Sequence, residues 1–126
     1  MQVKIDTREK FHVITIIEPD LAANMTAELE ECLLPFVERE TRNVVLNLED
    51  IENIDSAAAE ALLKIQQHFY DQQSSFVICN LSKEATASLD DEEVLEQLNM
   101  TPTESEAWDI VQMEEIEREL MGGDPL

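Results

Sequence analysis

Residues 44–63 read VVLNLEDIENIDSAAAEALL, and this stretch decides the fold. It opens with an apolar run of β-branched residues and leucine that is short enough for a buried strand. A polar turn follows, and Asp55 and Ser56 then stand directly before a segment rich in alanine and leucine. Serine is a preferred N-cap because its hydroxyl accepts a hydrogen bond from a first-turn N–H that is otherwise unpaired. The stretch therefore predicts a strand, a polar connection and a helix that Ser56 caps.

The residues after Ser56 predict one buried helix face. Apolar side chains recur there at helical spacing, namely at Ala58, Ala61, Leu62, Ile65 and Phe69. Upstream, Leu29 to Val37 shows the same period, but Pro35 falls inside it and must remove a backbone hydrogen bond. We therefore expect that earlier helix to kink or to end early.

Two other apolar runs have the length of strands, at residues 11–17 and 76–79, and residues 3–5 can begin an edge strand. They alternate with the helical segments, and short strands separated by helices favour parallel pairing through helical crossovers. The sequence thus predicts an α/β fold with a mixed sheet of four or five strands.

The C-terminal third is strongly acidic. From Glu84 onward the chain has fourteen acidic residues and one basic residue, Arg118. A short helix or turn is expected over 82–89. Two capping boxes are expected, at Asp90 with Glu93 and at Thr103 with Glu106. We divide the chain into a domain at 1–112 and an acidic helix end and tail at 113–126, in which Arg118 would relieve little of the repulsion.

Composition limits the classes of partner and chemistry. The 126 residues carry a formal net charge of −21, which disfavours nucleic acid and anionic membranes. No apolar run approaches the ~20 residues that span a bilayer, so we expect a cytoplasmic protein. Cys32 and Cys79 are expected to be reduced core residues. His12 and His68 lack metal-ligand spacing, so neither a metal nor a cofactor is expected.

The order of these elements resembles the STAS domains, the family of the bacterial anti-sigma factor antagonists. The resemblance covers about residues 2–112 and centres on Asp55-Ser56 at the junction between strand and helix. The family motif continues with Ser or Thr and then Gly-Leu-Gly, whereas this chain has Ala57 followed by Ala58-Ala59-Glu60. In an earlier loop the family has Gly-x-Leu-Asp, and the nearest aspartate here is Asp20. The resemblance implies a STAS-like sandwich whose helices pack mainly on one face of the sheet.

The resemblance also implies a function. Such a chain is a non-enzymatic regulator in a partner switch, in which an anti-sigma factor with serine-kinase activity phosphorylates the motif serine and a serine phosphatase resets it. Ser56 is then the phosphorylation site. The surface that contacts the partner would contain seven further residues, namely Asp20, Asn53, Ile54, Asp55, Ala57, Ala58 and Glu60.

Two alternatives remain open from the sequence. A STAS-type domain could serve as a structural adaptor without phosphorylation. An acyl carrier protein is also small and acidic, and it carries a pantetheine arm on a serine at a helix start. Carriers are helical bundles, however, and three runs here predict strands. The sequence has no Gly-rich phosphate loop and no Ser/His/Asp or Cys/His grouping that would indicate an enzyme.

Overall fold

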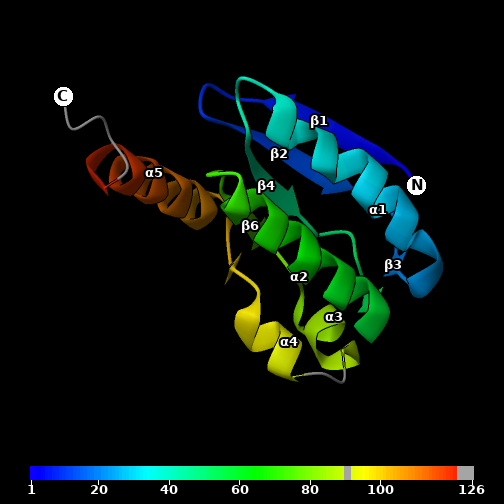
Figure 1. Ribbon diagram of the computed structural model, residues 1–126. Coiled ribbons are helices and arrows are strands. Elements are labelled where there is room, and N and C mark those ends of the chain that lie inside the picture. Colours follow the sequence, from blue (N-terminus) through cyan, green and yellow to red (C-terminus); the bar gives the residue numbers. More distant parts are fainter. Residues whose placement is uncertain (90–91, 122–126) are drawn as a thin grey trace.

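The computed structural model describes residues 1–89 and 92–121 and shows a mixed sheet with helices on both faces (Figure 1). The sheet order is β1-β2-β4-β6-β7; β1 pairs with β2 in antiparallel fashion, and the other three pairs are parallel. The strands are β1 (Val3–Thr7), β2 (Phe11–Ile16), β4 (Asn43–Asn47), β6 (Phe76–Cys79) and β7 (Met100–Thr101). A separate parallel pair joins β3 (Asp20–Leu21) to β5 (Asn53–Ile54).

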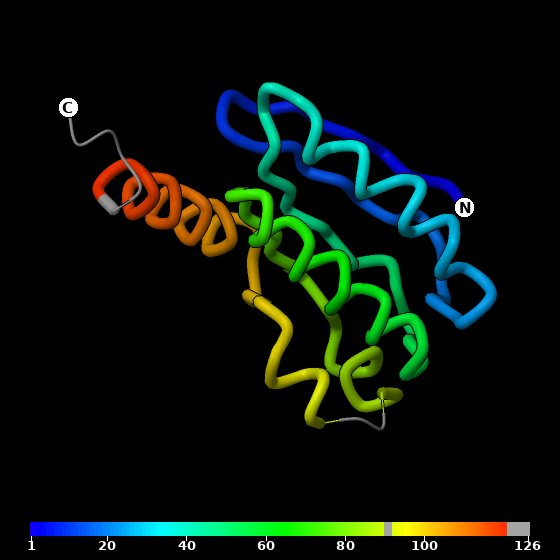
Figure 2. Tube along the Cα trace, in the orientation of Figure 1, coloured from blue at the N-terminus to red at the C-terminus, as the bar shows by residue number. Residues whose placement is uncertain are grey.

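Four α-helices cover one face of the sheet, and the fifth covers the other. The first face carries α1 (Thr26–Leu33), α2 (Ser56–Asp71), α3 (Lys83–Ser88) and α4 (Glu92–Gln97). The opposite face carries α5 (Glu104–Met121). In the tube view, α1 and α2 run side by side while α5 projects to the left, away from both (Figure 2). This arrangement confirms the predicted mixed α/β sandwich, with its helices mainly on one face.

The predicted strands are present with small changes at their ends. The runs at 3–5, 11–17, 44–48 and 76–79 correspond to β1, β2, β4 and β6. The fifth strand, β7, is two residues long, which is too short to show any periodicity in the sequence. The five-stranded sheet also excludes the helical bundle of an acyl carrier protein.

Pro35 ends the α1 helix early, as expected. The α-helix stops at Leu33, and a 3-10 helix, η2 (Leu34–Glu38), continues the chain with the proline in its first turn. Proline is tolerated there because the first N–H groups of a helix have no internal partner. Phe36 and Val37 still reach the core from this turn.

The core divides into two layers, one on each face of the sheet. On the first face, Val44, Leu46, Phe76 and Ile78 pack against the four helices. On the second face, a smaller cluster joins alternate strand residues to α5, and it consists of Phe11, Val13, Val45, Val77, Cys79, Ala107 and Val111. Since every residue of β4 is buried, this strand needs cover on both sides.

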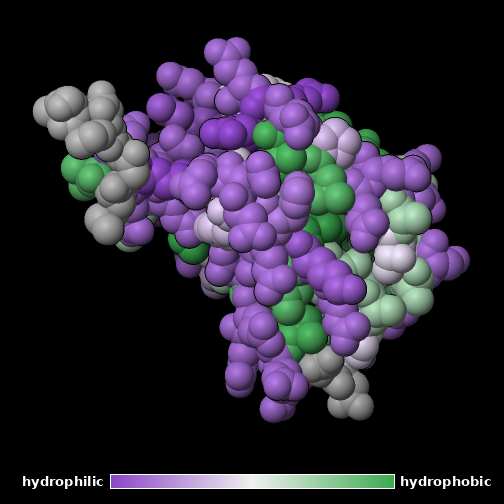
Figure 3. Space-filling model, in the orientation of Figure 1, coloured by the Kyte–Doolittle hydropathy of each residue, from purple (hydrophilic) through white to green (hydrophobic). Residues whose placement is uncertain are grey.

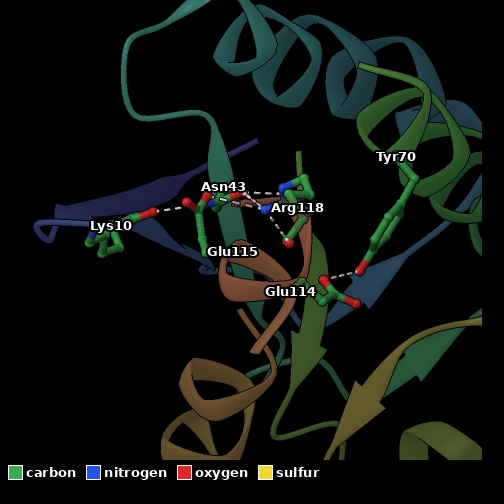
Figure 4. Close-up of polar contacts among 7 residues, drawn as sticks. Lys10, Asn43, Tyr70, Glu114, Glu115 and Arg118 are labelled. Atoms are coloured by element: carbon green, nitrogen blue, oxygen red, sulfur yellow. Dashed lines mark hydrogen bonds and ion pairs between the residues drawn. The ribbon is translucent and has the colours of Figure 1, made fainter. Parts of the chain in front are cut away.

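Polar contacts fix the second half of α5 to the sheet where strands β4 and β6 begin (Figure 4). The Asn43 side chain donates from Nδ2 to the Lys10 carbonyl (2.9 Å) and to Glu115 Oε1 (2.7 Å). Its Oδ1 accepts from the Ser75 N–H (2.7 Å) and from Arg118 Nη2 (3.2 Å). Arg118 also donates to Glu115 Oε1 (3.1 Å). We name these four side-chain partners, Asn43, Ser75, Glu115 and Arg118, the edge cluster.

The edge cluster corrects one expectation about the acidic end. We expected Arg118 to relieve little of the repulsion among the acidic residues of 113–126. Instead, Glu115 and Arg118 are both partly buried and bonded to buried Asn43. Charge patterning could not show this, because the partners lie more than seventy residues away in the sequence. The helix α5 crosses residue 112 without interruption, and the division there remains a prediction.

The two expected capping boxes differ in what the structure describes. At α5, the Thr103 hydroxyl accepts from the Glu106 N–H (3.2 Å), which is one half of the predicted box, and it donates to the Glu106 carboxylate (3.2 Å). Asp90 lies outside the described residues. The cysteines are free, as expected, and burial raises the pKa of the Cys79 thiol to about 12. That thiol is therefore protonated at neutral pH, which makes it a poor nucleophile.

Glu115→Gln should lower the free energy of unfolding at neutral pH and have little effect in acid. The Asn43 amide, and after it Arg118, lowers the pKa of the Glu115 carboxyl. The stability gained from this carboxylate is complete above its ordinary pKa of 4.5 and is lost as the pH falls through the lower folded-state pKa. Urea unfolding of both proteins from pH 7 to about pH 3 measures the difference. Glu117→Gln, at an exposed position on the same helix, is the matched control. A difference between wild type and Glu115→Gln that stays constant with pH would contradict this account.

Candidate functional site

Asp55 caps α2 and also holds the neighbouring loop. Its backbone is extended, and its Oδ1 accepts a hydrogen bond from the Ala58 N–H (2.9 Å). Its Oδ2 accepts from the Ala23 N–H (2.9 Å), which begins the 3-10 helix η1 (Ala23–Met25). One carboxylate therefore uses both oxygens, one on each of two segments that are far apart in the sequence.

The prediction that Ser56 is the N-cap of α2 is wrong. Ser56 is the first residue of the helix, and the cap is the residue before it. Both residue types are good caps, but a carboxylate has two acceptor oxygens and can serve the helix and the loop together. The sequence pattern Asp-Ser did not distinguish these two registers, because either residue could start the helix.

Ser56 is exposed, and its hydroxyl takes no part in capping the helix. Within the described part of the chain, its hydroxyl has no hydrogen-bond partner, since the first-turn N–H that it would have satisfied is taken by Asp55. The hydroxyl stands in the first turn of a helix of 16 residues, where the dipole and the free N–H groups favour a negative charge. Ser56 can thus be modified without loss of the helix cap.

The surface around Ser56 is acidic. Exposed carboxylates precede it at Glu49, Asp50 and Glu52, and Glu60 follows it one turn later on α2. Added negative charge here meets like charges and a strongly negative chain, so any phosphate would raise the repulsion toward an acidic partner and the attraction toward a basic one.

The predicted partner-contacting residues fall into two groups. Asp20, Asn53, Asp55, Ala57 and Glu60 are exposed. The Asn53 side chain donates to Asp20 Oδ1 (2.9 Å), so the paired strands β3 and β5 bring these two together. This contact shows how the aspartate of the early loop reaches the motif.

The other two predicted contact residues belong to the core. Ile54 is 3% exposed and Ala58 is fully buried, and both pack in the layer on the first face. The resemblance implied a contact role for both residues, and their burial shows that their side chains cannot touch a partner. Their side chains therefore support the site from beneath.

Ser88 was not predicted as a site residue, and its side chain holds β5 through a hydrogen bond to the backbone. Its hydroxyl accepts from the Ile54 N–H (3.0 Å) and donates to the Ala85 carbonyl (2.6 Å), which ties α3 to β5. No sequence signal marks it, because a serine at the end of a short helix normally satisfies its own helix. Ser88 and Asp55 together fix the backbone on which Ser56 stands.

No group of three His, Cys, Asp or Glu side chains suitable for a metal ion occurs in residues 1–89 and 92–121. Over the same ranges, no helix is both long and apolar enough to cross a membrane.

Asp55→Ala should lower the free energy of unfolding by about 1 kcal/mol or more, because it removes the cap of α2 and the bond to Ala23. Asp55→Asn should cost less, since one amide oxygen can still cap the helix. Ser56→Ala is the matched control and should change stability by less than about 0.5 kcal/mol, as is usual for a surface substitution. Urea unfolding measures all three. A larger loss for Ser56→Ala than for Asp55→Ala would restore Ser56 as the cap.

Comparison with known proteins agrees with this architecture. A search of curated proteins finds no match. Among solved structures, an anti-sigma factor antagonist fold from Thermotoga maritima superposes with a TM-score of 0.71 at 16% identity, covering 87% of this chain and 94% of that one. The anti-sigma factor antagonist SpoIIAA in its unphosphorylated form gives 0.67 at 15% identity, covering 89% and 97%.

The same fold also occurs inside larger proteins. The murine anion transporter Slc26a9 superposes with a TM-score of 0.65 at 14% identity, and the match covers 82% of this chain but 18% of the transporter. At these identities the superpositions establish the fold. The family model of the STAS domain matches residues 2–107 of the sequence itself. The chain therefore belongs to the STAS domain family.

Proposed function

We propose that this protein is a non-enzymatic regulator of the anti-sigma factor antagonist type, acting in the cytoplasm through a phosphorylation switch at Ser56. Its partner would be an anti-sigma factor with serine-kinase activity, and a serine phosphatase would reset the switch. The observation that carries the proposal is an exposed hydroxyl at the start of α2 that the fold does not use, because Asp55 is the cap.

The rigidity of the surroundings supports a switch that acts by charge. Asp55 and Ser88 bond the segments on either side of the serine, and Ile54 and Ala58 pack beneath it. A phosphate on Ser56 would therefore add about two negative charges to a surface that is already held in place. Such a charge acts directly on a bound partner and needs no rearrangement of the fold.

Solved relatives give the proposal a second line of support. Two neighbours of the same fold are described as anti-sigma factor antagonists, and one of them is specified as an unphosphorylated form. These descriptions apply to those proteins. For this chain, they support the proposal that the exposed serine of the Asp-Ser junction is phosphorylated and lies where a protein partner binds.

An adaptor without a covalent switch is the second candidate. The observation in its favour is that Ala58 and Ala59, which stand where the family has glycine and leucine, are fully buried. The backbone after Ser56 is therefore packed as an ordinary helix. The mass of the protein isolated from its own cells separates the two: a phosphate located on Ser56 supports the switch, and an unmodified serine under all growth conditions supports the adaptor.

Ser56→Asp should weaken partner binding at least tenfold without destabilising the fold, because the new carboxylate must lose its water at the proposed contact surface and lies among like charges. Ser56→Ala should bind as wild type does. Ser105→Asp is the matched control, since it adds the same charge in the first turn of α5, which covers the opposite face of the sheet. Isothermal titration with the partner recovered from native cells measures the three affinities.

Urea unfolding of each variant confirms that binding, and not folding, has changed. Equal binding by Ser56→Asp and wild type would reduce Ser56 to a structural position. Equal weakening by Ser105→Asp would mean that overall charge, and not this site, controls binding.

A further inference from the structure

The outer face of α5 carries large apolar side chains that the fold leaves exposed. Met113 is 59% exposed, Ile116 is 55% exposed and Leu120 is 79% exposed. On the opposite side of the same helix, Ala107 and Val111 are fully buried and Arg118 belongs to the edge cluster. The helix is therefore anchored by one face while a second apolar face points to solvent.

These three residues form one continuous stripe. They follow each other at spacings of three and four residues, which places them on one side of a helix. The stripe is about 10 Å long, given a rise of 1.5 Å per residue. We name Met113, Ile116 and Leu120 the α5 stripe. Figure 3 shows a small hydrophobic patch at the far left end of the molecule, where α5 lies in Figure 1.

Trp108 is part of the same helix but has a partner. It is 42% exposed and its ring lies 6.5 Å from the ring of Phe11, so the sheet supports it. Ile116 of the α5 stripe also lines a hollow of about 310 Å³, together with Lys10, Gln112, Glu115 and Glu119. A hollow of this size can receive a side chain from a docked helix.

The charges that α5 carries beside the stripe determine what it fits, and exposed Lys10 is the one basic side chain that lines the hollow at Ile116. From Glu104 to Leu120, every exposed charged residue of the helix is acidic, namely Glu106, Asp109, Glu117 and Glu119. The one basic side chain of that range, Arg118, is turned inward. A second copy of this chain would bring two such rims together, in proteins that each carry a net charge of −21. Charge repulsion thus disfavours a homodimer through this face.

We propose that the α5 stripe docks a basic amphipathic helix of a partner protein. Apolar residues of the partner at helical spacing would cover Met113, Ile116 and Leu120, and its Lys or Arg residues would face the acidic rim. The contact would be the packing of one amphipathic helix on another, with apolar anchors of α5 at i, i+3 and i+7. The surface lies on the face of the sheet opposite α2, so it is separate from the proposed switch at Ser56.

The probe for this proposal is a synthetic peptide of about 18 residues made of leucine and lysine, with leucine at i, i+3, i+4 and i+7. A second peptide of the same composition in scrambled order has the same charge but no apolar face. Trp108 is the single tryptophan of the chain and lies on the docking helix, so its fluorescence reports binding. Wild type should bind the amphipathic peptide at least tenfold more tightly than the scrambled one.

The double variant Met113→Gln with Ile116→Gln should lose this preference. The matched control is Ile5→Gln with Ile17→Gln, which removes two apolar side chains of similar exposure (46% and 43%) from another part of the surface and changes no charge. The control should keep the preference. Glu117→Gln should weaken binding of the amphipathic peptide by about two- to fivefold, as expected for one exposed charge pair.

Three outcomes would overturn the proposal. Equal affinity for both peptides would mean that the acidic surface binds cations without regard to the stripe. Equal loss in the control variant would mean that the stripe is not the binding surface. A concentration-dependent dimer in sedimentation, abolished by Ile116→Gln, would assign the stripe to a second copy of this chain.

Discussion

Complete burial of β4 is the constraint on which the rest of the structure depends. A strand with both faces in the core must be covered from two sides, and its neighbours must supply the pairing on both edges. Here α2 covers one side and α5 the other, while β2 and β6 pair with it in parallel. The chain leaves the carboxyl end of this central strand, passes through β5 and enters α2, which packs back on the sheet. Ser56 owes its position to that geometry.

The sequence predicted the larger elements because each of them buries an apolar face with its own period. β2, β4, β6 and α2 are all longer than three residues and are rich in β-branched residues, leucine or alanine. The shortest strands, β3, β5 and β7, have two residues each and follow from tertiary pairing alone. Asp55 shows the same limit at the site. Its residue type was visible as a candidate contact, but its role depends on the Ala23 N–H, which only the folded chain brings near.

The contacts of Asn43 with Glu115 and Arg118 follow the same logic and explain how so acidic a chain keeps its last helix in place. One buried amide accepts from the arginine and donates to the glutamate, so it satisfies both signs of charge at once. Glu114 accepts a hydrogen bond from the Tyr70 hydroxyl (2.7 Å), and Glu104 pairs with Arg8 (3.7 Å). The exposed carboxylates of α5 affect partners more than they affect folding, and they are Glu106, Asp109, Glu117 and Glu119. One face of α5 therefore makes the contacts that hold the helix to the sheet, and the opposite face exposes most of its acidic side chains.

The two core layers differ in their number of buried side chains, and this difference affects the motion of α5. The second layer contains seven buried side chains, only two of which come from α5, whereas the first joins four helices to the sheet. Further contacts of α5 come from the partly buried Ile110, the half-exposed Trp108 and the edge cluster. A helix with so few fully buried side chains opens at a lower free energy than the body of the domain. We expect the amide protons of α5 to exchange with solvent through such local opening, ahead of those of β4 and α2. The last helix would then behave as a separately cooperative unit, on a sheet that stays formed beneath it.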